Sequence, residues 1–176
     1  MSEIPPGEHL SPFETQRELH AVFAQETRHR IIQTILGHPA HLPSLAELAY
    51  YSQKSESAVL DQLAELGEFG LTTTYDLEAS QRKRNLPGTF YGFTERGVLL
   101  LDRFEYLRGA PMLQAVHEQT AKTERIRRHE NAPRPELPDT VATMLESGGS
   151  EGDGSELAAA LSESITGEAD SLRDLF

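Results

Sequence analysis

Arg82, Lys83 and Arg84 form the only run of three basic residues in the 176-residue chain. They lie between the β-branched stretch LTTTYDL and the aromatic stretch TFYGF, and a Pro-Gly pair follows them. This order predicts a β-hairpin with a basic tip, anchored by Phe90 and Phe93 on one face of the returning strand. Arginine at a tip is suited to entering a narrow DNA minor groove. The alternative is a solvated loop without a partner.

A second polar set lies on the segment from 55 to 69. Apolar residues recur there at helical spacing and predict a helix with one buried stripe, formed by Val59, Leu63, Leu66 and Phe69. The opposite face is polar. Serine and carboxylate groups hydrogen-bond to base edges, and leucine contacts thymine methyl groups. The alternative is a solvated acidic face. The DNA contacts expected from this face and the turn before it are Gln53, Lys54, Ser55, Glu56, Ser57, Leu60 and Asp61.

Metal binding and catalysis have little support in the sequence. His38 and His41 lie in the segment HPAH, and imidazole is a common metal ligand. However, the chain has no cysteine, and no acidic residue accompanies this histidine pair in the loop. Gly-rich phosphate loops, nucleophile elbows and the His-Glu-x-x-His pattern are absent from the sequence. We therefore expect no metal, no cofactor and no enzyme activity.

The elements that would position these residues are mostly helical. A first helical stretch is predicted from 12 to 36. Ser44, with Glu47 three residues later, forms a capping-box pattern that begins a short second helix before the turn SQKS. After the hairpin, apolar segments predict helices from 95 to 107 and from 111 to about 129. The predicted fold class is mostly α with a small β-hairpin.

The helices between 94 and 131 also predict a homodimer. The first is too apolar for the surface of a monomer, and the second has too few apolar residues for a core of its own. Pairing across a two-fold axis would cover both. The residues expected at this interface are Leu99, Leu100, Phe104, Leu107, Leu113 and Val116.

The charge of the chain is strongly negative and unevenly distributed. The chain has 28 acidic and 16 basic residues. This acidity and the scarcity of lysine favour adaptation to multimolar salt, although an ordinary acidic protein with an acidic tail has the same balance. Residues 132–176 carry 10 acids and 2 bases. Because few bulky apolar residues accompany them, we expect a largely disordered tail that DNA binding does not need. A protein partner for this tail remains open.

The remaining composition points to an intracellular protein. No apolar run approaches the roughly 18 residues of a membrane helix, so no membrane partner is expected. The first residues are polar and acidic, unlike a signal peptide. Residues 1–11 are expected to be a flexible N-terminus, and the expected location is cytoplasmic.

Three stretches occur in the order found in archaeal winged helix-turn-helix regulators of the ArsR/PadR-like type. FAQETRHRIIQTIL resembles their first helix, SLAELAYYSQKSESAVLDQLAELGEFGL their helix-turn-helix, and YGFTERGVLLL their second wing strand and dimer helix. The composition also fits small haloarchaeal regulators of the RosR type, which act in the response to oxidative stress. The resemblance covers Leu19 to Leu107. It departs from the family in its acidic recognition helix.

The resemblance implies a sequence-specific transcription regulator that binds a palindromic operator in double-stranded DNA as a homodimer. It assigns 12–93 to the winged helix-turn-helix and 94–131 to dimerisation helices. The helix 55–69 would enter the major groove and the tip 82–84 would lie near the minor groove. Inorganic cations are expected at the DNA interface, between carboxylates and phosphates. The alternative is a winged-helix protein-interaction module that binds a basic partner through its acidic face and tail.

Arg28 and Arg30 lie in the first predicted helical stretch, and two roles are open for them. In winged helices, that helix end can touch the DNA backbone. The second role is an ion pair within the chain, with Glu26 or Glu47 as the acidic partner.

Overall fold

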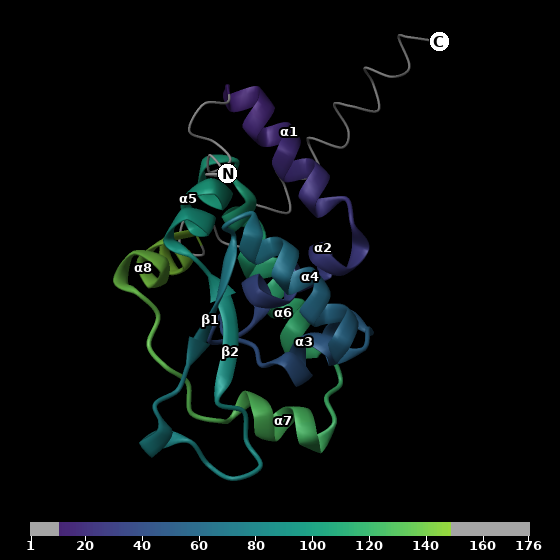
Figure 1. Ribbon diagram of the computed structural model, residues 1–176, viewed down its shortest axis with the longest axis vertical. Coiled ribbons are helices and arrows are strands. Elements are labelled where there is room, and N and C mark those ends of the chain that lie inside the picture. Colours follow the sequence, from purple (N-terminus) through teal and green to yellow (C-terminus); the bar gives the residue numbers. More distant parts are fainter. Residues whose placement is uncertain (1–10, 149–176) are drawn as a thin grey trace.

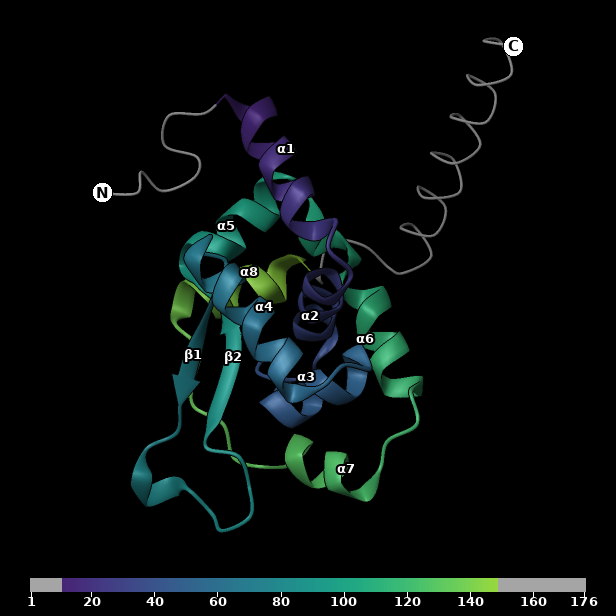
Figure 2. The ribbon, with the colours of Figure 1, turned by 45° about the vertical axis from the view of Figure 1, so that its right-hand side comes forward.

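The computed structural model describes residues 11–148, which form a helical body around one two-stranded hairpin (Figure 1). Figure 2 shows the same arrangement from a second side, with the hairpin loop and α7 at one end and α1 at the other. The helices are α1 (Pro12–Phe23), α2 (Glu26–Gly37), α3 (Leu45–Ser52), α4 (Glu56–Glu68), α5 (Glu95–Arg103), α6 (Ala110–Gln119), α7 (Glu124–Glu130) and α8 (Asp139–Gly148), and the strands are β1 (Thr72–Asp76) and β2 (Thr89–Phe93).

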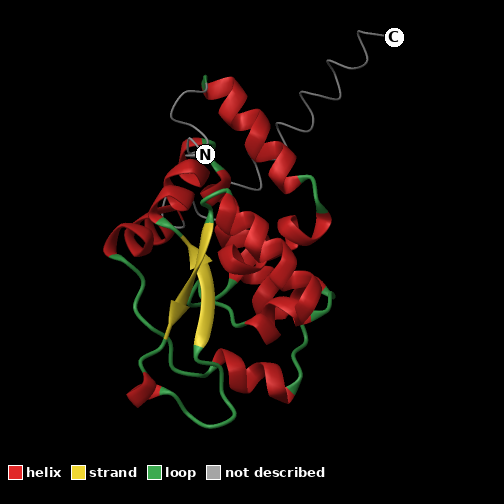
Figure 3. Cartoon of the chain, viewed as in Figure 1, coloured by secondary structure: helices red, strands yellow, loops and turns green. Residues whose placement is uncertain are grey.

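The mostly helical fold with a small hairpin is confirmed, as the distribution of secondary structure shows (Figure 3). Two short 3-10 turns, Ala79–Gln81 and Tyr106–Gly109, complete the described elements. No helix in the described range is both long enough and apolar enough to span a membrane.

The predicted helix from 12 to 36 is wrong in its continuity, because the chain breaks it at Ala24 and Gln25. Gln25 has extended backbone angles, and its side-chain oxygen accepts a hydrogen bond from the Arg28 amide at 2.7 Å. It therefore caps α2 instead of continuing α1. Leu19 and Phe23 of α1 are buried. Apolar spacing continued across the break, so periodicity alone did not reveal it.

The helix-turn-helix consists of α3 and α4, and local sequence sets both of its starts. Ser44 and Glu47 form the predicted capping box, with the Ser44 amide donating to Glu47 Oε2 at 2.7 Å. Gln53 ends α3 with a left-handed backbone (φ 56°). Ser55 then caps α4 by accepting from the Ala58 amide at 3.1 Å. The tight turn therefore fixes the orientation of α4 relative to α3.

The hairpin pairs β1 and β2 in antiparallel register, with Thr72 opposite Phe93 and Asp76 opposite Thr89. Phe90 and Phe93 are both fully buried, as expected for anchors. They do not share one face, because residues three apart in a strand point to opposite sides. Phe93 joins the main core, whereas Phe90 packs with Leu42 in a separate small cluster.

The expected boundary of the acidic tail at residue 132 is wrong. Residues 139–148 form α8, and Val141 and Leu145 are buried in the main core at 0% and 3% exposure. These apolar residues pack against α5 and the turn at 106–109. Leu137 and Met144 are partly buried against the same core, so apolar packing holds this short helix in place. The remaining tail, 149–176, and residues 1–10 lie outside the described range, whereas Ser11, the last residue of the expected flexible N-terminus, is the N-cap of α1.

The C-terminal helices differ from prediction in extent and in packing. The helix predicted from 111 to 129 is two helices, α6 and α7, since Thr123 caps α7 separately. Gly37 permits close contact between α2 and α6, because a Cβ there would lie 2.7 Å from the Leu113 carbonyl oxygen. With α8 also covering α5, one chain buries most of the apolar surface of this region.

Candidate nucleic-acid interface

The exposed face of α4 carries the residues predicted to contact bases. Glu56, Ser57, Leu60 and Asp61 are all exposed, and Val59 is fully buried on the opposite side. Leu60 is 43% exposed and is the one large apolar side chain on this exposed face of α4. The structure thus leaves a polar helix face with one apolar side chain exposed to solvent.

The turn before α4 is also exposed, but two of its side chains already have partners within the chain. Ser55 is occupied as the α4 cap. The Lys54 ammonium lies 3.7 Å from Glu26, and Gln53 is exposed. An exposed ion pair at that distance contributes little and is readily exchanged for a phosphate.

Arg28 and Arg30 are half-buried, and each is hydrogen-bonded within the chain. Arg28 Nε donates to Gln62 Oε1 at 2.9 Å. Arg30 donates to the Ser52 carbonyl at 2.9 Å and pairs with Glu26 at 2.9 Å. These bonds tie α2 to the helix-turn-helix. Of the two acidic partners considered for this region, Glu26 is the one that pairs with Arg30.

The hairpin tip brings the three predicted basic residues together but gives them different roles. Arg82 Nε donates to the Leu77 carbonyl at 3.0 Å, and its side chain lies against Gly88, where a Cβ would come within 3.0 Å of it. Arg82 therefore stabilises the loop. Lys83 and Arg84 are exposed and make no side-chain hydrogen bond or ion pair with any residue from 11 to 148.

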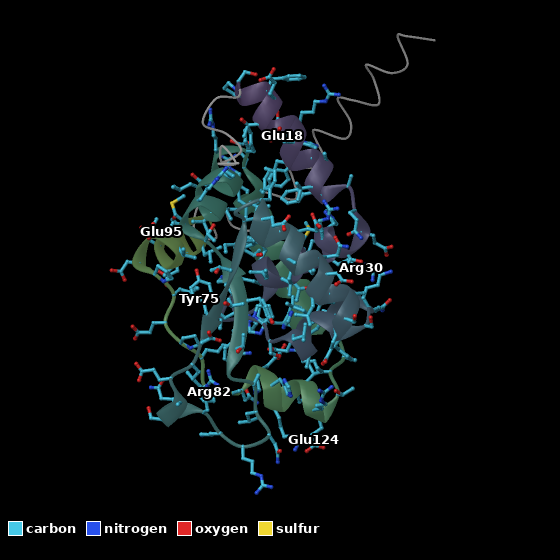
Figure 4. The ribbon with its side chains drawn as sticks, in the orientation of Figure 1. Glu18, Arg30, Tyr75, Arg82, Glu95 and Glu124 are labelled. Atoms are coloured by element: carbon cyan, nitrogen blue, oxygen red, sulfur yellow. The ribbon has the colours of Figure 1, made fainter. Side chains whose placement is uncertain are left out.

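A third basic group, on α7, was missed by the sequence analysis. Arg125, Arg127 and Arg128 are exposed, and Arg125 lies 3.9 Å from Glu56 at the start of α4. The available signal was the segment RIRR, three arginines within four residues. Figure 4 labels Arg82 on the hairpin loop and Glu124 on α7 at the same end of the molecule, with Glu18 of α1 at the other end.

α7 is joined to the helix-turn-helix by a buried network of ionisable groups. Arg134 donates to Glu47 Oε2 at 2.8 Å, and His38 Nε2 lies 2.8 Å from Glu47 Oε1. His38 Nδ1 accepts from the Ala40 amide at 3.1 Å, so Nε2 carries the proton of a neutral ring. Burial lowers the pKa of His38 and keeps it neutral. Burial by itself would raise the pKa of Glu47, but its hydrogen bond from His38 and the Arg134 charge outweigh this and lower it.

The second half of the network is centred on Glu130, at the end of α7. Its carboxylate accepts from Tyr51 at 2.6 Å and lies 2.5 Å from His117 Nε2 and 2.9 Å from Lys122 Nζ. Burial opposes ionisation, but the hydrogen bonds from Tyr51, Lys122 and His117 hold the pKa of Glu130 at about 2. Glu130 is therefore ionised and fixes the end of α7 against α3 and α6.

Three residues of this network have the chemistry of metal ligands. Ligand atoms of His38, Glu47 and Glu130 lie within 4.8 Å of one another. The Arg134 guanidinium already compensates Glu47, however, and stands where a metal ion would be repelled. His41 does not join them, because its Nδ1 lies 2.9 Å from the Ile35 carbonyl oxygen. The arrangement is that of a buried ion-pair network.

The six residues predicted at a dimer interface differ in exposure and fall into three pairs. Leu100 and Leu107 are 9% and 1% exposed within one chain, so the expectation that they form an intermolecular surface is wrong. Phe104 and Leu113 are partly buried against the same core. Leu99 and Val116 remain exposed, at 52% and 57%. α8 covers the apolar face that seemed to need a partner.

The chain has the winged helix-turn-helix fold, with α2, α3 and α4 followed by the β1–β2 wing. A solved structure from Halomicrobium mukohataei, described as a protein with a GntR superfamily winged-helix-turn-helix domain, matches with a TM-score of 0.64 and 27% sequence identity. The match covers 81% of this chain and 97% of that one, so it extends well beyond the winged helix itself. It supports the winged helix-turn-helix without supporting the ArsR/PadR-like or RosR type.

Comparison with protein families and with curated proteins adds no further assignment. No family model matches the sequence, and no curated protein matches it.

Proposed function

We propose that this chain is a sequence-specific DNA-binding transcription regulator. The observation that carries the proposal is the exposed face of α4, with Ser57, Leu60 and Asp61, in a winged helix whose tip presents Lys83 and Arg84, which have no side-chain partner between residues 11 and 148. In this arrangement α4 enters the major groove and the wing tip lies near the minor groove. The haloarchaeal origin of the similar structure supports a halophilic archaeal source.

The chemistry of α4 favours base readout over electrostatic attraction. Its described face has Glu56, Asp61, Glu65 and Glu68 and no basic residue. Carboxylates accept from cytosine amino groups, and Leu60 fits a thymine methyl group. We propose that inorganic cations bridge the remaining carboxylates to nearby phosphates.

We further propose that the chain acts as a homodimer on a palindromic operator. The support is the set of large apolar side chains that stay exposed: Phe13, Leu99, Met112 and Val116. Two-fold pairing would cover such residues and set the spacing of two operator half-sites. Sedimentation at micromolar concentration in high salt tests this, and a monomer under those conditions would exclude it.

The decisive experiment is selection of genomic DNA fragments by the full chain in high salt, followed by sequencing. Enrichment of palindromic sites supports the proposal. A Leu60→Ala variant should then relax base preference at one position and lose affinity corresponding to about 1 kcal/mol or more per half-site. Glu18→Gln, on the exposed surface of α1, is the matched control and should select the same sites.

A protein-interaction module is the second candidate. The same acidic face of α4 favours it, because four carboxylates on one helix suit a basic protein partner. No enrichment of any DNA sequence, together with saturable binding to a basic protein that Asp61→Asn weakens, would favour this function over DNA binding.

A further inference from the structure

We propose that α7 is an additional DNA-contacting element, which binds the phosphate backbone through Arg125, Arg127 and Arg128 alongside the helix-turn-helix. This inference rests on the proposed DNA-binding function. It adds a second surface to the reading face of α4 and the wing, one that supplies affinity rather than base recognition.

Charge sets this segment apart from the rest of the chain. Residues 122–134 contain five bases and two acids, whereas the described range as a whole has 15 bases and 19 acids. An isolated basic cluster in an acidic protein produces a local positive potential that attracts a polyanion.

The distribution of unpaired cations points to the same end of the molecule. Most basic side chains from 11 to 148 have a carboxylate, carbonyl or aromatic partner within the chain. The basic residues with no such partner among the described residues are Arg17, Lys83, Arg84, Arg127 and Arg128. Four of these five lie on the wing tip and α7, which occupy one end of the fold, and Arg17 lies on α1 at the other end (Figure 1).

Contacts place α7 directly beside the elements that would read DNA. Arg125 lies 3.9 Å from Glu56 at the start of α4. Both residues line a groove of about 570 Å³ between α3, the start of α4 and α7, and Lys54 lines it as well. One turn further along α7, His129 Nδ1 lies 3.2 Å from the hydroxyl of Ser44, the cap of α3. A DNA strand that leaves the major groove past the start of α4 therefore meets the α7 arginines.

α7 is fixed before any DNA binds. Ile126 is its only fully buried residue, yet Glu130 is anchored by Tyr51, His117 and Lys122. The Arg134 guanidinium further ties the segment after α7 to Glu47 and to the Leu42 carbonyl. Binding a phosphate strand on a preformed surface avoids the entropy of ordering a loop. Arginine suits the task because its planar guanidinium forms paired hydrogen bonds with phosphate oxygens.

The test uses the full chain and a site recovered by the genomic selection. We expect Arg127→Ala/Arg128→Ala to weaken binding roughly five- to tenfold, to a similar extent on specific and unrelated DNA, as loss of phosphate contacts does. The variant should shift the slope of log affinity against log salt by about one to two in the positive direction. Hydroxyl-radical footprints should lose protection at the outer flank while the central protection stays.

Arg17→Ala/Arg108→Ala removes the same charge from the opposite end and is the matched control; it should change affinity less than twofold. Thermal unfolding of all variants checks that the fold is kept, and Arg127→Lys/Arg128→Lys should restore much of the affinity. If the wild type binds a site and the α7 variant binds it equally well with an unchanged footprint, α7 is not a DNA contact and only this inference falls. If the control loses as much as the α7 variant, net charge explains the effect and the inference also falls. If the wild type enriches no site, the proposed function falls together with it.

Discussion

α4 and α7 are neighbours at the helix-turn-helix end of the molecule, but they differ in charge and in what holds them. α4 is acidic on its exposed face and is fixed by the apolar side chains of Val59, Leu63 and Leu66. α7 is basic and is fixed mainly by the network around Glu47 and Glu130. The surface with base-reading chemistry therefore depends on apolar packing, whereas the surface suited to phosphate depends on buried ionisable groups.

Removing the chain after α7 should have the largest effect, because it removes both the cation that pairs with Glu47 and the helix that covers α5. A chain that ends after Asn131 lacks Arg134 and the buried Val141 and Leu145, so its free energy of unfolding should fall by about 5 kcal/mol or more. A chain that ends after Gly148 should unfold like the full chain. It should bind DNA equally well or more tightly, because the removed segment has seven acids and one base.

Urea unfolding and DNA binding of the two shortened chains check this prediction. Equal stability of both would show that α8 and Arg134 contribute nothing to the fold.

A single substitution can remove the cation of the buried network around Glu47. Arg134→Ala leaves the Glu47 carboxylate buried without its cation, and we expect the free energy of unfolding to fall by about 3–5 kcal/mol. Arg125→Ala removes only an exposed pair with Glu56 and should cost about 1 kcal/mol or less. Urea titrations of both variants measure the difference. Similar small losses would mean that α7 is held by something other than the network.

Acid should weaken the attachment of α7 before it affects α4. Burial lowers the pKa of His38 and His129, so the unfolded chain binds protons near pH 6.5 that the folded chain does not. The contribution of these two histidines to the free energy of unfolding is complete above their pKa in the unfolded chain. It is lost as the pH falls toward their lower pKa in the folded chain. Glu47 and Glu130, whose folded pKa values are also lowered, add a further loss below about pH 4.5.

The groups that face His38 are Glu47, Arg134 and His117, and those that face His129 are Glu47, Arg125, Arg128 and Arg134. We therefore expect urea midpoints to fall between pH 7.5 and 5.5, and His38→Gln to reduce that fall. The control is His20→Gln at an exposed histidine, which should leave that fall unchanged. A midpoint independent of pH over this range would contradict the buried neutral histidines.

The smallest expected effect is that of salt on DNA affinity. Acidic α4 should take up cations on binding while the basic wing tip and α7 release them, so the two contributions oppose each other. At molar salt the screening length is about 3 Å or less, which leaves direct contacts dominant. We expect the dissociation constant to be nearly flat, or to fall, between about 0.5 and 2 M potassium chloride. A tenfold loss of affinity over that range, measured on a selected site, would show that ordinary electrostatic attraction prevails.

Local sequence by itself determined the parts of this protein that local physics controls. Ser44 and Glu47 predicted the start of α3, the apolar stripe from Val59 predicted α4, and two β-branched and aromatic stretches predicted the wing. These features follow from capping bonds and side-chain alternation within a few residues. The polar face of α4 followed equally from the spacing of its apolar stripe.

Tertiary structure decided what depends on partners far apart in the chain. The sequence around Arg134 predicted the start of a tail. In the structure, Arg134 is held by a hydrogen bond to Glu47, which lies 87 residues earlier. Val141 and Leu145 gain their role only because α5 offers an apolar face to cover, and this removed the strongest reason to expect a dimer through Leu100 and Leu107. The arginines of α7 became a candidate surface only once folding placed α7 against the start of α4 and at the same end of the molecule as the hairpin loop. Long-range burial and charge compensation have no signature in local spacing, because the free energy of each group depends on the neighbours that folding supplies.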